Sequence, residues 1–113
     1  MPPRIELLFW AGCPSHPRAL ADLRAALAEA GLDPAAVELR EIATDEEAAR
    51  ERFAGSPTIR IDGADIVDPG DTPPSLSCRV YRRRDGRFTA VPDPDDLRDA
   101  LRALNRQQGA TIR

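Results

Sequence analysis

The chain has 113 residues, of which 42% are apolar and 31% charged, and its formal net charge is −3. This size suits one domain with a single core, so we assign residues 1–106 to it and expect residues 107–113 to form a frayed tail. Every basic residue is Arg, spread along the chain. The acidic balance gives no electrostatic reason to expect nucleic acid or a membrane surface as a partner.

The N-terminal apolar run contains Glu6 and is much shorter than the about 20 residues of a membrane span. It also lacks the length and cleavage pattern of a secretory signal. We therefore expect a cytoplasmic protein, in which two cysteines are catalytic, metal-binding or inert rather than a disulfide framework.

The first part of the chain predicts a strand, a loop and a helix. Residues 4–10 form a buried apolar run typical of a strand. Residues 11–17 contain Gly and two prolines, which indicate a loop. From residue 17 to 30, leucines at helical spacing predict an amphipathic helix that Gly31 can end.

The middle of the chain predicts a second strand, helix and strand. Residues 36–42 alternate apolar and charged side chains. Thr44 followed by Glu47 is a capping-box signature that opens a helix through residue 53, closed by Gly55. Residues 58–61 read as a third strand, followed by a turn.

The last part predicts a hairpin and a helix. Residues 78–82 and 87–90 read as strands joined at Asp85, with Arg82 to Arg84 as a solvated hairpin end, and residues 65–77 as loop. Asp93 can cap a final helix. The order β-α-β-α-β-β-α predicts an α/β domain with a mixed central sheet, helices on both faces, and the strand from Cys78 beside residues 58–61.

Cys13 is the first candidate for chemistry. It stands between the first strand and the first helix, where unpaired backbone N–H groups and the positive end of the helix dipole favour a thiolate. The thiolate is both the nucleophile and the soft-metal ligand. Pro14 fits this position because its missing N–H would be unpaired in any case. The alternative is an inert buried cysteine.

The loop from Trp10 to His16 resembles the active-site loop of the thioredoxin superfamily, including short bacterial proteins of that family. Gly55 to Thr58, just before a strand, is similar to the family's cis-proline segment. The resemblance implies a thioredoxin-like fold and a cis Ser56–Pro57 bond that faces Cys13. It also implies that the Ser56 backbone is free to pair with a bound partner's chain.

The chain departs from the family pattern at His16, which stands where the dithiol enzymes have their second cysteine. The loop therefore lacks a local thiol to resolve a mixed disulfide, which indicates a monothiol-type site. His16 could stabilise the thiolate or exchange a proton, or simply be polar surface. Trp10 could shield the thiolate or belong to the core. Cys78 could resolve a mixed disulfide or be a buried strand cysteine.

Three functions follow from these residues. The first is a thiol redox protein, a candidate thiol–disulfide oxidoreductase, that uses Cys13 on protein or small-molecule thiols and disulfides without a cofactor. Its catalytic candidates are Cys13, His16 and Cys78, and its substrate-binding candidates are Trp10, Pro14, Ser56 and Pro57. The second is a protein that binds a soft metal or organomercurial through Cys13 and Cys78; no other metal site is expected. The third is a non-catalytic adaptor.

Overall fold

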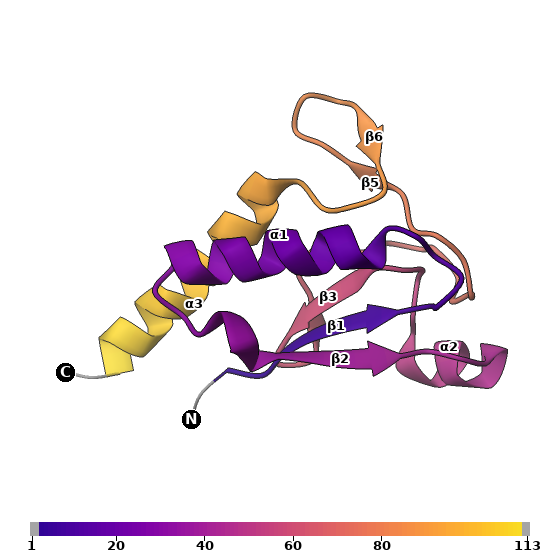
Figure 1. The fold of residues 1–113 in the computed structure, drawn as a ribbon, viewed down its shortest axis with the longest axis horizontal. Helices are drawn as coiled ribbons and strands as arrows, with labels where there is room; N and C mark the ends of the chain where they lie inside the picture. The colour runs from indigo at the N-terminus through magenta and orange to yellow at the C-terminus, as the bar shows by residue number, and fades with distance from the viewer. Residues whose placement is uncertain (1–2, 112–113) are drawn as a thin grey trace.

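The computed structural model describes the backbone of residues 3–111 and the side chains of residues 3–104. Figure 1 shows helices packed on a twisted sheet, with a small hairpin projecting from one end. The elements in chain order are β1 (Ile5–Phe9), α1 (His16–Glu29), the short 3-10 helix η1 (Pro34–Ala36), β2 (Val37–Glu41), α2 (Asp45–Glu51), β3 (Thr58–Ile61), β4 (Ala64–Asp65), β5 (Tyr81–Arg82), β6 (Phe88–Thr89) and α3 (Pro94–Thr111).

The main sheet is a mixed sheet of four strands in the order β2-β1-β3-β4. β1 runs parallel to β2, as the helical crossover α1 between them requires, and antiparallel to β3. β4 follows β3 through a turn in which Asp62 and Gly63 both have positive φ, the conformation that joins two antiparallel strands most tightly. The predicted α/β class with a mixed sheet is confirmed.

Alternate side chains of β1 enter two separate cores. Ile5 and Leu7 pack with α1 and α3 on one face, whereas Leu8 packs on the other face with Ala48 of α2 and the fully buried Phe53. This alternation is the two-residue period of a strand that is covered on both faces. The predicted placement of helices on both faces of the sheet is therefore confirmed.

Two predicted helix caps are present. The Thr44 hydroxyl accepts a hydrogen bond from the Glu47 N–H at 3.1 Å, and Asp93 accepts one from the Asp95 N–H at 2.9 Å. The predicted end of the second helix is wrong: Arg52, with φ of 52°, terminates α2 before Gly55 is reached. The last helix continues to Thr111, past residue 106, and residues 112–113 lie outside the described part.

The prediction that a strand from Cys78 lies beside β3 in the main sheet is wrong. The edge of β3 is taken by β4, and Ile66 extends this pairing with an N–H bond to Ile59. A partner reached through a tight turn costs less chain entropy than one some twenty residues further on. Cys78 makes only a single parallel bridge, to Ser56, and β5 pairs with β6 as a separate two-stranded sheet.

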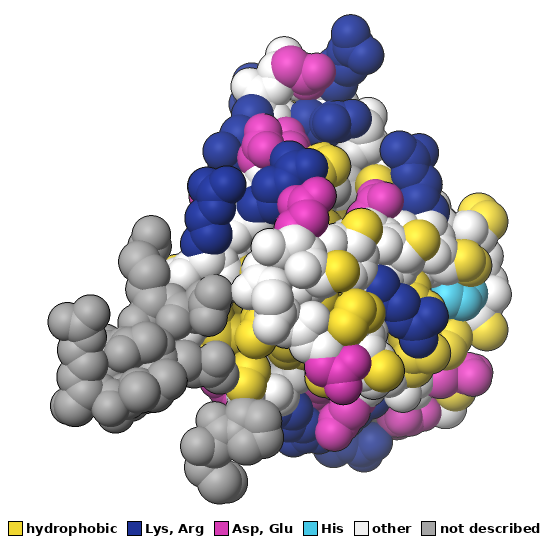
Figure 2. All heavy atoms as spheres, turned by 60° about the vertical axis from the view of Figure 1, so that its left-hand side comes forward, with side chains coloured by type: hydrophobic (Ala, Val, Ile, Leu, Met, Phe, Trp, Pro, Cys, Tyr) yellow, Lys and Arg dark blue, Asp and Glu magenta, His cyan; other side chains and the backbone are white. Residues whose placement is uncertain are grey.

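Two arginines of the hairpin end lie next to acidic side chains. Arg84 contacts Asp96 and Asp99, and Arg83 lies 3.9 Å from Asp93. On the face in Figure 2, dark blue basic and magenta acidic side chains are interspersed. Among the residues that the structure describes, no helix is both long enough and apolar enough to cross a bilayer.

A buried charged cluster holds the segment that follows Cys78. The Asp65 carboxylate forms ion pairs with Arg60 at 2.7 Å and with Arg79 at 3.3 Å. Both guanidinium groups are largely buried. Arg79 also donates to the Val67 carbonyl at 2.7 Å and to the Thr58 hydroxyl at 3.2 Å. Because its charge and its donors are satisfied only in this geometry, Arg79 fixes the backbone next to Cys78.

Substitution Asp65→Asn keeps the shape of this side chain and removes its charge. We expect it to lower the free energy of unfolding by about 3 kcal/mol or more, because two buried guanidinium groups lose their shared counter-ion. Urea denaturation measures the effect. Asp85→Asn is the control, since its ion pair with Arg87 is exposed and its loss should cost less than about 1 kcal/mol. Equal losses in the two variants would contradict this role for Asp65.

Candidate active site

Cys13 lies in the turn between β1 and α1, two residues before the helix N-cap Ser15. Its N–H bonds the Trp10 carbonyl at 2.9 Å, which closes the turn. Its thiol donates to the Ser56 carbonyl, with Sγ and O 3.4 Å apart. The Ser56–Pro57 bond is cis, as predicted, and the predicted contact of this segment with Cys13 is confirmed.

The Ser56 backbone is not free, which corrects the expectation that it pairs with a partner's chain. Its N–H donates to the Ser77 carbonyl and its own carbonyl accepts from the Arg79 N–H, both at 2.8 Å. The segment from Ser77 to Arg79 therefore occupies the main-chain edge that a bound peptide would need. The reason is tertiary: the buried Arg79 side chain brings this segment of the same chain to Ser56.

The same pairing brings Cys78 to Cys13. Both cysteines are free, and each adjoins Ser56: the Cys13 thiol donates to the Ser56 carbonyl, and Cys78 forms a parallel bridge with Ser56. The interaction between the two thiols lowers the pKa of Cys13 and raises the pKa of Cys78. Cys78 is exposed, whereas Cys13 is 1% exposed. The structure therefore places the two sulfurs in one site, although 64 positions of sequence separate residue 13 from residue 78.

The two thiols have pKa values shifted in opposite directions. Burial raises the pKa of Cys13, but hydrogen bonds from the Ser15 backbone, Ser56 and Cys78 outweigh it, and the net pKa lies below the usual 9.0. The hydrogen bond with Cys13 raises the pKa of Cys78, and desolvation adds to it. When the pair carries one negative charge, that charge therefore resides mainly on Cys13.

Ser56 contributes a buried hydroxyl that sequence reasoning did not single out. Its side chain is 0% exposed, and Oγ lacks a hydrogen-bond partner among the described residues while Cys13 is a protonated thiol. A buried donor without an acceptor is costly. Once Cys13 is a thiolate, its sulfur supplies that acceptor, which accounts for the lowering of the Cys13 pKa by Ser56.

The remaining predicted site residues surround the loop rather than the sulfur. His16 places Nδ1 3.0 Å from the Cys13 carbonyl oxygen, so that nitrogen carries the proton and donates it, and the ring stacks on Phe9 at 4.4 Å. Trp10 is half-buried against the core on the α2 face of the sheet and lies over Gly12. Pro14 is exposed. These contacts shape the loop, whereas Ser15, Ser56 and Cys78 act on the thiol.

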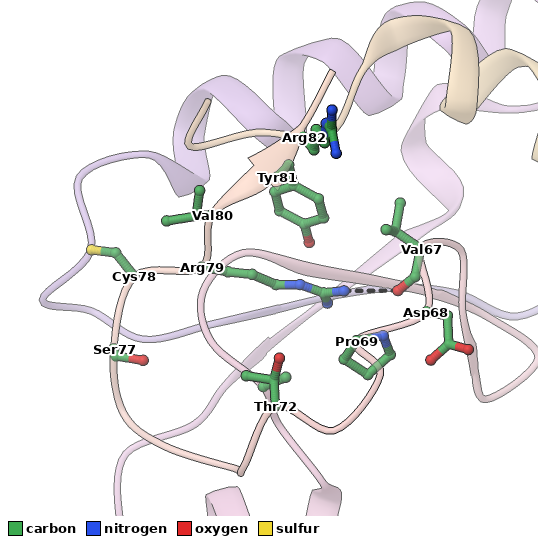
Figure 3. A pocket seen from close by; sticks show the side chains of 11 residues that line it. Val67, Asp68, Pro69, Thr72, Ser77, Cys78, Arg79, Val80, Tyr81 and Arg82 are labelled. Carbon is green, nitrogen blue, oxygen red and sulfur yellow. Dashed lines mark hydrogen bonds between the residues drawn. The ribbon is translucent and has the colours of Figure 1, made fainter. Parts of the chain in front are cut away.

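A cavity of about 460 Å³ adjoins the site behind Cys78. Figure 3 shows the Arg79 side chain reaching across it to the Val67 carbonyl, while the Cys78 sulfur is directed away from it. The Arg79 guanidinium also donates hydrogen bonds to Thr58 and Asp65, in addition to the bond to Val67. The Arg79 side chain that crosses this cavity holds the backbone next to Cys78, and the Cys78 sulfur does not face the cavity.

Within the described residues, no group of three or more His, Cys, Asp or Glu side chains could hold a metal ion. A soft cation at this site would therefore have two thiolates as its protein ligands.

Comparison with known proteins gives no match to a protein-family model, to a curated protein or to a solved structure. The site belongs to an α/β domain in which a buried and an exposed cysteine both adjoin Ser56.

Gly12→Ala tests the packing of the loop. A Cβ at this position would overlap the Trp10 ring, so the ring has to move. We expect a loss of about 1–3 kcal/mol in stability from overpacking. Trp10 is the only tryptophan in the chain, so its emission maximum should shift to longer wavelength as the ring is displaced. Ala11→Ser, at an exposed neighbouring position, is the control and should change neither measurement.

Ser56→Ala tests how the thiolate is stabilised. We expect the pKa of Cys13 to move up toward 9.0, because the hydroxyl that donates to the thiolate is lost. Stability should change little, since the removed hydroxyl has no partner in the thiol form. Thiolate absorbance at about 240 nm, followed against pH, measures the pKa. Ser75→Ala, whose hydroxyl bonds Ser77, is the control; an unchanged Cys13 pKa in Ser56→Ala would refute this role.

The two pKa shifts also fix the sign of the pH dependence of stability. Between the folded pKa of Cys13 and 9.0, the unfolded chain binds a proton at Cys13 that the folded chain has released. The stability that Cys13 contributes is therefore fully present above pH 9.0 and is lost as pH falls through the folded pKa of Cys13. Cys78 has the opposite sign: its contribution is present below pH 9.0 and is lost as pH rises through its raised folded pKa.

Proposed function

We propose that this protein is a thioredoxin-like thiol–disulfide redox protein whose redox unit is the Cys13–Cys78 pair. One observation carries the proposal: both cysteines adjoin Ser56, since the Cys13 thiol donates to the Ser56 carbonyl and Cys78 forms a parallel bridge with Ser56. The pKa values of the two thiols, displaced in opposite directions by their mutual interaction, agree with this arrangement. A pair of this kind has a thiolate ready to attack and a neighbouring sulfur to receive the attack.

The arrangement around the pair supports the thioredoxin-like part of the proposal. A cysteine loop follows β1 and leads into α1, and the Ser56–Pro57 segment precedes β3 and contacts that loop. The sheet is mixed, with parallel β1 and β2 and antiparallel β3. These features agree with the resemblance that the loop and proline segments show in the sequence.

Cys78 supplies the second thiol that the loop lacks at position 16. Oxidation of the pair forms one S–S bond between Cys13 and Cys78 and removes two electrons. An external disulfide accepts both electrons, its own S–S bond breaks, and the two protons of the pair end on the two thiols that it yields. The cycle requires no group besides these two thiols and the external one.

The partner class follows from the occupied backbone of Ser56. A protein substrate that docks as a strand needs free N–H and C=O groups, and both groups of Ser56 already bond Ser77 and Arg79. A small thiol or disulfide needs only access to a sulfur atom, and Cys78 is exposed. We therefore propose low-molecular-weight thiols and disulfides as the reaction partners.

The adjacent thiols also favour a second function, the binding of a soft cation such as Cu(I) or Hg(II) between two thiolates. This function uses the same pair without oxidation. It differs from the redox function in a measurable way, because the bound cation protects both thiols from alkylation until a chelator removes it, whereas a disulfide is released only by a reductant.

The redox proposal predicts an intramolecular disulfide. On treatment with glutathione disulfide, the wild-type protein should lose the mass of two hydrogens, stay monomeric on a non-reducing gel and lose both reactive thiols, since both cysteines adjoin Ser56. Intact mass and thiol titration measure this outcome. The variants Cys13→Ser and Cys78→Ser should instead retain one bound glutathione each, because no second thiol resolves it.

Stable glutathione adducts on the wild type, without an internal disulfide, would count against the redox pair. If the reduced wild type binds one equivalent of Hg(II) and yet never forms the disulfide, the soft-cation function replaces it. An unreactive wild type in both assays would leave the adaptor function.

A further inference from the structure

The two sulfurs of the pair differ in how an outside molecule can reach them. Cys13 is 1% exposed and its thiol is directed to the Ser56 carbonyl. Cys78 is exposed, and in Figure 3 its sulfur lies on the outer side of the segment, away from the cavity. An external reagent therefore meets Cys78 before it meets Cys13.

We propose that Cys78, and not Cys13, is the sulfur that forms the mixed disulfide with the external thiol, while Cys13 is the internal thiolate that resolves it. This inference rests on the proposed redox function and assigns the order of its steps. It reverses the order expected from the sequence, in which Cys13 attacks because it precedes a helix.

Two external thiols reduce the Cys13–Cys78 disulfide in two steps. An external thiolate attacks the Cys78 sulfur of the Cys13–Cys78 disulfide; the internal S–S bond breaks, and its electron pair stays on Cys13 as a thiolate. A second external thiol then attacks the mixed disulfide, and the two external thiols leave as one disulfide while Cys78 regains its thiol. The thiol of lower pKa is the better leaving group, and this thiol is Cys13.

The reverse direction uses the same geometry. Cys78 gives its proton to the neighbouring Cys13 thiolate through their hydrogen bond and attacks an external disulfide, which releases one external thiolate. The released external thiolate then takes the proton from Cys13. The Cys13 thiolate then attacks the Cys78 sulfur, forms the internal disulfide and releases the second external thiolate.

Hydrogen bonds hold the segment that contains Cys78 firmly in place. The Ser77–Arg79 segment is held by two backbone hydrogen bonds of 2.8 Å to Ser56. The Arg79 side chain adds its bonds to Asp65 and Val67. A direct attack from Cys13 on an outside disulfide would require a sulfur that is 1% exposed to be uncovered, whereas attack at the exposed Cys78 leaves these contacts in place.

Mapping the mixed disulfide tests the order of steps. The oxidised wild type is mixed with excess reduced glutathione, quenched within milliseconds to seconds with iodoacetamide, digested and analysed by mass spectrometry. We expect glutathione on Cys78 and the carbamidomethyl group on Cys13. Glutathione on Cys13 with alkylated Cys78 would overturn the inference and leave the redox function intact.

The single-cysteine variants give a second test that does not depend on the internal disulfide. With glutathione disulfide, Cys13→Ser should acquire glutathione at Cys78 at least about tenfold faster than Cys78→Ser acquires it at Cys13, because only Cys78 is accessible. In urea that unfolds both variants the two rates should converge. Faster modification of Cys78→Ser in the folded state would overturn the inference, and failure of the wild type to form any internal disulfide would count against the redox function instead.

Discussion

The pairing of Ser56 with the Ser77–Arg79 segment is the constraint on which the site depends. Two backbone hydrogen bonds of 2.8 Å join segments that are about twenty residues apart and place Cys78 against Cys13. The bridge is too short to be stable as a strand pair on its own. It persists because Arg79, the residue after Cys78, is anchored in the interior by Asp65 and Val67.

The buried charges explain why the sheet and the site form together. Asp65 belongs to β4, the short strand that follows the turn after β3, and it binds Arg60 of β3 as well as Arg79. The local hairpin thus creates the acceptor that captures the distant arginine. A buried ion cluster adds little net stability compared with apolar packing, but it accepts only one geometry, and here that geometry sets the position of a reactive thiol.

The chemistry of the pair results from unequal environments for two identical groups. Cys13 is enclosed, yet the Ser15 backbone and Ser56 favour its thiolate form and lower its pKa. Cys78 is exposed and donates to Cys13, which keeps its own proton on. One sulfur is therefore suited to hold charge and the other to meet the partner, so reactivity and accessibility are divided between the two residues.

The sequence by itself determined the local features: the strand of residues 58–61, the caps at Thr44 and Asp93, the cysteine turn before α1 and the cis bond before Pro57. The strand, the caps and the turn depend on residues close in the chain, so periodicity and turn chemistry predict them. The cis bond is expected from the resemblance of residues 55–58 to a cis-proline segment. The tertiary structure alone decided that β4 occupies the edge of β3, that Ser77–Arg79 covers the Ser56 backbone, and that Cys78 is the exposed member of the thiol pair. Such contacts depend on which distant segments compete for one edge and on where a buried arginine finds its counter-ion, and no local pattern of residues encodes that outcome.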